Sequence, residues 1–157
     1  MFNRVVKLSS DTAGAALLEF TVVFPLLLMI TLGLLQFGLI FYGYAMLNGA
    51  AAAGSRQLSI SRLDTSPYTN TLTVVRTAST LTAATLGITT SINGSPCSSD
   101  SSCRTALAAS APNGHIVTPA AVTVTYPCTV IMPTAWLNLA NLCVGGVLRS
   151  TMIQPVE

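Results

Sequence analysis

The stretch that decides the fold is Gly14–Leu26, GAALLEFTVVFPL, in which one carboxylate stands at the start of a long apolar run. After Glu19 no charged residue occurs before Arg56, and fifteen of the 23 residues at positions 20–42 are Leu, Ile, Val or Phe. Those fifteen favour insertion into a bilayer by roughly 5 to 9 kcal/mol, and about twenty helical residues cross the hydrocarbon core. The sequence therefore predicts a transmembrane helix at about residues 20–42.

The helix is expected to extend beyond the bilayer and to occupy residues 15–58. In its far part Ala45, Gly49 and Ala53 recur at i, i+4 and i+8, which places three small residues on one stripe. Such a stripe permits close approach of a second helix, so it is a candidate helix-packing site. The alternative is that alanine-rich sequence is simply a good helix former.

Glu19 itself has two interpretations. As a flanking residue it lies in the headgroup region, where a carboxylate costs little. As a functional residue it is drawn into an assembly and matched there by a positive charge. The candidate partners are Arg4, Lys7 and, if the chain is cut after Gly14, the new α-amino group of Ala15.

The composition separates this chain from ordinary soluble domains and from nucleic-acid binders. Of its 157 residues 51% are hydrophobic and 8% are charged, whereas about 25% of the residues in typical soluble domains are charged. The formal net charge is +2, and the seven basic residues are scattered. A nucleic-acid footprint needs clustered Lys and Arg, so no nucleic acid is expected as a partner.

All four cysteines, Cys97, Cys103, Cys128 and Cys143, follow the apolar run. An even count on one side of a membrane indicates disulfides in an oxidising compartment. Zinc is the competing interpretation, but it prefers close cysteine pairs with histidine nearby, and the single histidine is His115. Four cysteines allow three pairings, among which short loops favour Cys97–Cys103 and Cys128–Cys143.

Residues 59–157 are expected to form a small extracytoplasmic head of the α+β class. A second helix is predicted over about 66–86, and the segment 93–103, NGSPCSSDSSC, is predicted to be a loop. Alternation and β-branched residues predict strands at 87–92, 120–126 and 144–154. The sequence thus predicts a long N-terminal helix followed by a disulfide-stabilised head with a second helix and a few antiparallel strands.

No catalytic constellation is evident in this head. The acids that follow the apolar run are Asp64, Asp100 and Glu157, which are far apart in sequence. The sequence contains neither a nucleophile elbow, a phosphate-binding loop nor a zinc-protease helix motif. We therefore expect a protein that is not an enzyme, with no catalytic residue, cofactor, metal or small-molecule ligand.

The spacing around Glu19 is similar to the prepilin-type processing pattern, a glycine followed by four residues, a glutamate and an aromatic residue. Gly14, Glu19 and Phe20 match this pattern. Residues 14–56 resemble the TadE-like family of tight-adherence (Tad/Flp) pilus proteins, although that family often has an acidic residue where Gln36 stands. The further matching features are Pro25, Gly33, Phe37, Gly38 and the run Ala53–Arg56.

The resemblance implies a pseudopilin or minor pilin that takes part in assembling a Tad pilus for adhesion and biofilm formation. A prepilin peptidase would cut between Gly14 and Ala15, so that residues 1–14 are a leader. Glu19 would then neutralise the N-terminal amine of a neighbouring subunit. The implied partners are the inner membrane, the peptidase, other pilus subunits and the pilus assembly platform.

The head is expected on the periplasmic or extracellular side of the bacterial inner membrane. Arg4 and Lys7 precede the apolar helix and Arg56 and Arg62 follow it, so the positive-inside rule is balanced. The cysteines and the cleavage scheme both place the N-terminus in the cytoplasm and the head outside it.

Two alternatives from other classes remain. A secreted protein with a signal peptide cut near the alanines at 50–53 would have a very long apolar core, since secretory cores have about 7–15 residues. A permanently anchored periplasmic binding or adhesive protein would never be processed. The mature N-terminus separates these readings: Ala15 indicates pilin-like processing, a start within 52–55 indicates a signal peptide, and Met1 indicates neither.

Overall fold

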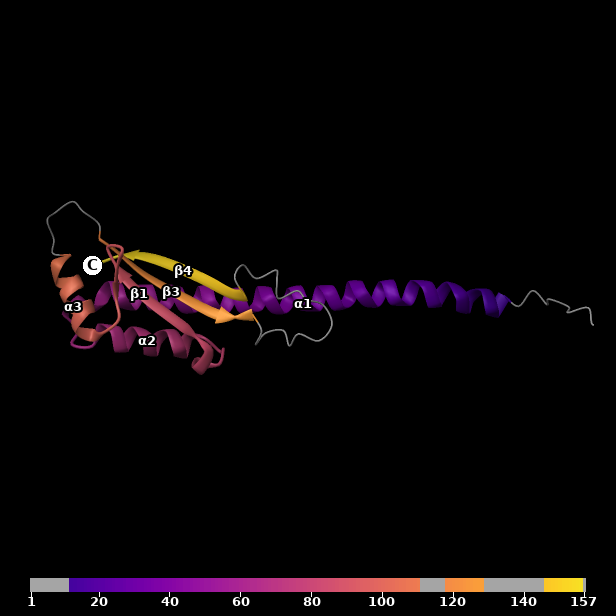
Figure 1. The fold of residues 1–157 in the computed structure, drawn as a ribbon, viewed down its shortest axis with the longest axis horizontal. Coiled ribbons are helices and arrows are strands. Elements are labelled where there is room, and N and C mark those ends of the chain that lie inside the picture. Colours follow the sequence, from indigo (N-terminus) through magenta and orange to yellow (C-terminus); the bar gives the residue numbers. More distant parts are fainter. Residues whose placement is uncertain (1–11, 111–117, 129–145, 157) are drawn as a thin grey trace, which may run out of the picture. The chain divides into compact units, whose positions relative to one another are not determined.

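The computed structural model describes residues 12–110, 118–128 and 146–156, and the chain divides into two compact units, Met1–Gly38 and Leu39–Glu157. Helix α1 (Thr12–Ile60) begins in the first unit and ends in the second. The other described elements, shown in Figure 1, are η1 (Ser61–Leu63), α2 (Pro67–Ala78), η2 (Ala83–Thr85), β1 (Gly87–Ile92), β2 (Ser95–Cys97), α3 (Asp100–Ala109), β3 (Pro119–Pro127) and β4 (Val147–Pro155). A long apolar helix followed by a small α+β head is the predicted fold class, which the structure confirms.

In the first unit α1 presents its side chains outward. Every residue from Leu17 to Leu32 is exposed, although most of them are apolar. The rings of Phe20 and Phe24, one helical turn apart, stack with their centroids 5.3 Å apart. A contiguous apolar surface of this kind marks contact with a membrane or with other proteins.

The second unit contains a four-stranded antiparallel sheet in the order β2-β1-β3-β4. Its central strand β3 has the predicted alternation: Val122, Val124 and Tyr126 are buried on one face, while Thr125 on the other face is partly exposed. The cross-strand partners of Val122 are Thr90 of β1 and Met152 of β4. The strands predicted at 87–92, 120–126 and 144–154 correspond to β1, β3 and β4, although residues 144 and 145 of the last prediction lie outside the described residues.

The buried face of the sheet packs against α1 and α2. The core residues of α1 are Leu47, Ala50, Ala51, Gly54, Ser55 and Leu58, which recur at helical spacing on one side. At Gly54 the packing is tight, because a Cβ atom there would collide with Val75 of α2 and lie 3.2 Å from Cγ1 of Val122 in β3. A glycine at this position thus permits the close approach of α1 to both neighbours.

The predicted loop at residues 93–103 is wrong, because it contains β2 and the first turn of α3. Asn93 and Gly94 both have positive φ, 52° and 78°, and form the two-residue turn of a β1–β2 hairpin. Ser99 then caps α3, accepting from the amide of Ser102 at 3.2 Å, while the Ser102 hydroxyl accepts from the amide of Ser99 at 3.1 Å. Serines that occur in loops also form capping boxes, and here they begin a helix.

The second helix is shorter than the predicted 66–86. It begins at Pro67, as predicted from the preceding Ser66, but ends at Ala78. Ser79 is already extended, and its hydroxyl donates to the carbonyl of Arg76 at 3.3 Å. Such side-chain hydrogen bonds compete with helix continuation, and residues 83–85 form only the short η2.

Candidate functional site

The predicted processing site lies at the beginning of α1. Gly14 and Ala15 are in the first turn of this helix, and Glu19 and Phe20 are exposed on its next turns. Within the described residues Glu19 forms no ion pair. Arg4 and Lys7, its predicted partners in the uncut chain, lie outside the described residues. The pairing of Glu19 with a positive charge therefore stays a prediction.

In the described part of the chain one helical stretch, Leu17–Leu63, which comprises most of α1 and η1, is long and apolar enough to cross a membrane. Two of its polar side chains are satisfied within the helix: the hydroxyl of Thr21 donates to the carbonyl of Leu17 at 2.7 Å, and that of Thr31 to the carbonyl of Leu27 at 2.8 Å. A hydroxyl bonded in this way costs less inside a bilayer than a free one. The helix is therefore compatible with the predicted single-pass anchor.

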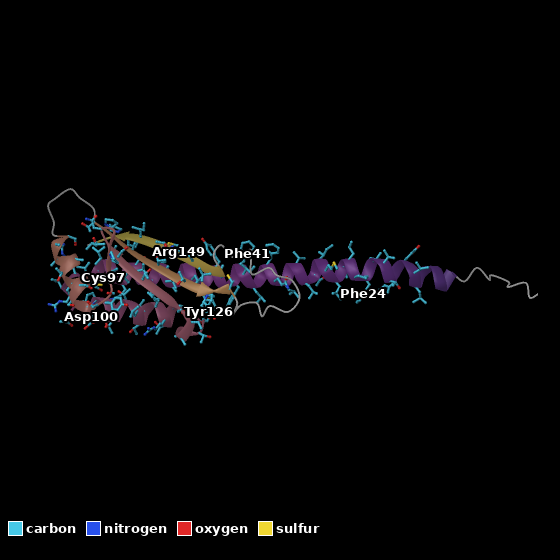
Figure 2. The ribbon with its side chains drawn as sticks, viewed as in Figure 1. Phe24, Phe41, Cys97, Asp100, Tyr126 and Arg149 are labelled. Carbon is cyan, nitrogen blue, oxygen red and sulfur yellow. A yellow bond between two sulfur atoms is a disulfide. The ribbon has the colours of Figure 1, made fainter. Side chains whose placement is uncertain are left out.

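Large apolar side chains surround this helix. Met29 is 72% exposed and Phe41 69%, and Figure 2 shows Phe24 and Phe41 extending from the helix surface. In water this surface would be strongly unfavourable, at about 25 cal/mol per Å² of apolar area. The described part of the chain leaves it to be covered by lipid or by neighbouring helices.

The small-residue stripe is separate from the face of α1 that packs in the head. Ala45 and Gly49 are exposed and Ala53 is partly exposed, and a Cβ atom built at Gly49 has open space around it. The packing face is instead the one that contains Gly54. Ala45, Gly49 and Ala53 remain a predicted contact for a helix from another subunit.

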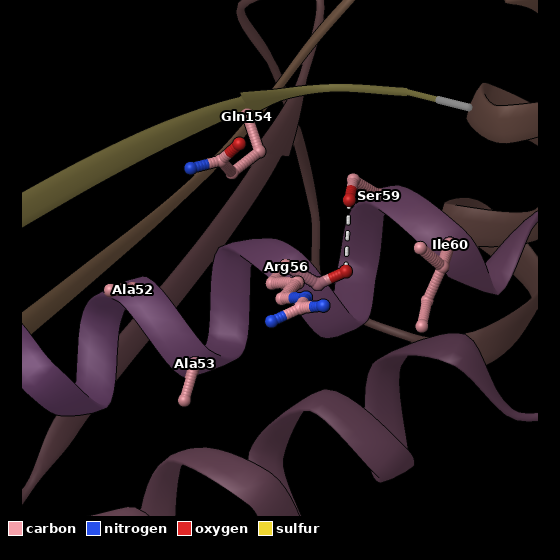
Figure 3. Close-up of a pocket in the computed structure, with 6 residues that line it drawn as sticks. All are labelled: Ala52, Ala53, Arg56, Ser59, Ile60 and Gln154. Atoms are coloured by element: carbon pink, nitrogen blue, oxygen red, sulfur yellow. Dashed lines mark hydrogen bonds between the residues drawn. The ribbon is translucent and has the colours of Figure 1, made fainter.

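A hollow of about 580 Å³ adjoins this stripe (Figure 3). Its lining residues are Ala52, Ala53, Arg56, Ser59 and Ile60 of α1, with Gln154 of β4. The hydroxyl of Ser59 donates to the carbonyl of Arg56 at 2.8 Å, the bond drawn in Figure 3. The exposed guanidinium of Arg56 has no ion-pair partner in the described part of the chain. A chain that packs on the stripe would meet this cation.

The predicted disulfide Cys97–Cys103 is present and joins the end of β2 to α3. Both cysteines are buried, and Thr90 of β1 donates its hydroxyl to the carbonyl of Cys97 at 2.5 Å. Cys128 is buried and disulfide-bonded, whereas Cys143, its predicted partner, lies outside the described residues, as does His115. No group of three or more potential metal ligands occurs among the residues that the structure describes.

Two carboxylates organise the turn between α1 and α2 and the start of α3. Asp64 accepts from the side-chain amide of Asn70 and the backbone amide of Ser66, and these bonds hold its pKa below the ordinary value. Asp100 accepts from the backbone amide of Thr69 at 2.9 Å and from the hydroxyl of Thr69 at 2.7 Å, which lowers its pKa as well. Both acids therefore act as structural acceptors.

These observations define a class of protein: a chain with one helix suited to a membrane and a disulfide-bonded α+β head. Within that class, residues 14–56 match the TadE-like protein family, which confirms the resemblance found at Gly14, Glu19 and Phe20. No curated protein and no solved structure matches the chain. The family match therefore covers α1 from Gly14 to Arg56.

Sequence reasoning missed a second group of polar residues, which lies in the head. Arg62 of η1 and Arg104 of α3 line one cleft, together with side chains of α3. The capping sequence Ser99-Asp100 could have revealed α3, but no sequence pattern brings Arg62 and Arg104 together, because their proximity depends on the packing of α3 against η1.

Proposed function

We infer that this chain is a membrane-anchored pseudopilin or minor pilin that takes part in assembling a Tad pilus, used for adhesion and biofilm formation. The observation that carries this proposal is that the family match, residues 14–56, lies within helix α1, whose first half is apolar and exposed. In this proposal the helix acts twice, first as a membrane anchor and then as the contact between subunits.

In this proposal a prepilin peptidase removes residues 1–14 on the cytoplasmic side and leaves Ala15 as the new N-terminus. The chain crosses the inner membrane once, with its head in the periplasm or outside the cell. Support comes from the Cys97–Cys103 disulfide in the head, because disulfides persist in oxidising compartments.

Glu19 is the residue that sets the register between subunits. Inside a bundle of apolar helices an unpaired carboxylate is strongly unfavourable, whereas one paired with a cation is tolerated. The α-amino group of Ala15 in a neighbouring subunit supplies that cation after cleavage. Because each subunit carries one such carboxylate and one such amine, only one axial offset pairs them all.

The small-residue stripe then gives neighbouring helices a place to approach. Ala45, Gly49 and Ala53 are exposed or partly exposed in the single chain, so they are free to contact another subunit. Close helix packing of this kind is driven by van der Waals contact and does not require charged residues.

The test is the Glu19→Gln variant, expressed in cells that assemble the pilus. It keeps the size and shape of the side chain, removes its charge, and replaces one acceptor oxygen by an amide donor. We expect the variant to insert into the membrane normally and to be absent from purified fibres or strongly depleted in them. The matched control is Glu19→Asp, which keeps the charge and is expected to retain part of the incorporation.

Mass spectrometry of the mature chain tests the processing step separately. A chain that begins at Ala15 supports the proposal, and a chain that begins within 52–55 would show a signal peptide instead. If Glu19→Gln enters fibres as efficiently as the natural chain, the pairing of Glu19 with the neighbouring amine is wrong.

A further inference from the structure

A second cleft lies in the head, between η1 and one face of α3. Its volume is about 380 Å³, and its lining residues are Arg62, Ser101, Arg104, Thr105 and Ala108. The four residues of α3 recur at i, i+3, i+4 and i+7, so they form one stripe of the helix. The cleft thus presents two guanidinium groups and two hydroxyl groups, and no carboxylate is among its lining residues.

The acids near this cleft are already engaged elsewhere. Asp64 is bonded to Asn70 and to the amide of Ser66, and Asp100 is bonded twice to Thr69. Asp100 lies one turn before Arg104 on α3, but the attraction of Arg104 is the smallest of the causes that lower its pKa. Over the described residues neither arginine forms a salt bridge, so the cleft keeps a local positive charge.

The hydroxyl groups that line the cleft also have lone pairs left to accept hydrogen bonds from a ligand. The hydroxyl of Thr105 donates to the carbonyl of Ser101 at 3.0 Å, so its oxygen is left as an acceptor. The hydroxyl of Ser101 lies 3.1 Å from that of Ser99, which donates to Ser102, so Ser101 donates to Ser99 and its oxygen is left as an acceptor. Guanidinium groups bind planar anions through paired N–H donors, and the hydroxyls can accept from a neutral polar ligand group.

We propose that this cleft binds the carboxylate of a sugar acid, so that the head attaches the pilus to an acidic polysaccharide. The inference rests on the proposed function, which supplies the extracellular fibre on which such binding would be useful. The cleft, about 380 Å³ in volume, is open to solvent and can therefore receive one sugar unit of a polymer. The mixed donors and acceptors suit a ligand that carries hydroxyls beside its carboxylate.

Two other occupants fit the head less well. A second copy of this chain offers no free carboxylate on its described head, since Asp64 and Asp100 are both engaged. Nucleic acid requires a track of several cations, whereas only two arginines converge here. Each cleft alone would bind weakly because it is open to water, and many subunits along one fibre would raise the avidity.

The experiment measures binding of the full mature chain, in detergent micelles, to an immobilised polyuronate, with neutral dextran as the reference surface. The test variant is the double substitution Arg62→Gln and Arg104→Gln. The matched control is Arg76→Gln with Arg149→Gln, which removes the same charge from exposed arginines outside the cleft. Equal thermal midpoints of the two double variants show that both heads remain folded.

We expect polyuronate to bind in preference to dextran, and the cleft variant to lose about tenfold in affinity, as the removal of charge-assisted hydrogen bonds predicts. The control should stay within about twofold. Equal losses in both variants would mean unspecific charge attraction and would overturn the proposal. Displacement of the polymer by inorganic phosphate as readily as by free uronate would also overturn it, as would displacement by an acidic peptide at lower concentration.

This result is separable from the test of the proposed function. The cleft variant is expected to assemble into fibres normally, because neither arginine lies in the family match at 14–56. Loss of fibres in Glu19→Gln together with loss of uronate binding only in the cleft variant would support both proposals. Fibre assembly that is indifferent to Glu19, with uronate binding intact, would remove the register mechanism alone.

Discussion

Hydroxyl groups, more than charges, satisfy the polar requirements of this chain. Thr71 is buried and donates its hydroxyl to the carbonyl of Pro67 at 2.7 Å, and Thr73 bonds in the same way to Thr69 at 2.9 Å. The same i→i−4 bond recurs at Thr21 and Thr31 in the apolar part of α1. These hydroxyl groups are thus satisfied locally, within one turn of their own helix.

The ionised carboxylate of Asp100 makes the stability of the folded head depend on pH. Its bonds to Thr69 lower its pKa in the folded chain below the ordinary 3.8, so the unfolded chain binds a proton more readily. The stabilisation is present above about pH 4 and is lost as the pH falls through the folded pKa. We expect Asp100→Asn to lower the thermal midpoint of the head at pH 6, and this difference from the natural chain to shrink towards pH 3.

The measurement is a pair of melting curves, natural chain and variant, recorded in micelles over this pH range. Asp64 also titrates there, and repulsion from Asp100 raises its pKa, but this is the smallest of the causes that act on Asp64, so its titration largely cancels in the difference between the two proteins. A difference that stays constant from pH 6 to pH 3 would show that the charge of Asp100 does not stabilise the head.

At the scale of elements, α1 has two functions on different faces. One face of its second half fills the head core with Leu47, Ala50 and Leu58, while its first half exposes apolar side chains throughout. The opposite stripe with Ala45 and Gly49 carries no side chain larger than a methyl group. One helix can therefore anchor the head and still offer a free surface to neighbouring subunits.

Alanine substitutions at Gly49 and Gly54 test whether the exposed stripe and the core face of α1 are distinct. Gly54→Ala puts a methyl group against Val75, a stiff β-branched side chain, and we expect a net destabilisation of about 1 to 2 kcal/mol despite the better helix propensity of alanine. Gly49→Ala meets open space and should stabilise the head by roughly 0.5 to 1 kcal/mol. Thermal unfolding followed by circular dichroism measures both changes. Equal effects of the two substitutions would contradict the packing described for α1.

The elements that sequence predicted well are those with a strong periodic signal. The apolar helix and the strand around Val122 and Val124 follow directly from their patterns. Strand β2 and helix α3 were missed because they are short, rich in serine and bury only Cys97, Cys103 and Leu107. The sequence does mark these elements, by Asn93-Gly94 at the hairpin turn and by Ser99 at the helix cap. Each mark is only one or two residues long, so it produces no periodic pattern.

At the scale of the whole molecule, one candidate site could be predicted from the sequence and the other could not. Glu19 and Phe20 could be found from sequence because they belong to a spacing within one helix. The cleft between Arg62 and Arg104 could not, because it forms only when α3 packs beside η1. Figure 2 shows Cys97 and Asp100 in this region, where β2 leads into α3, and the Cys97–Cys103 disulfide holds that connection. The disulfide therefore also fixes the start of the helix that carries Arg104.

The orientation of the chain is the prediction that joins these parts, because both the register charge and the cleft require the head to lie outside the cytoplasm. Thr89 is exposed on β1, so Thr89→Cys places a reactive thiol on the head without disturbing its core. We expect a membrane-impermeant maleimide to label this variant in intact spheroplasts as strongly as after lysis. The natural chain is the control for background, since its described cysteines are all disulfide-bonded. Labelling that appears only after lysis would place the head in the cytoplasm, where a stable disulfide is rare and a fibre cannot form.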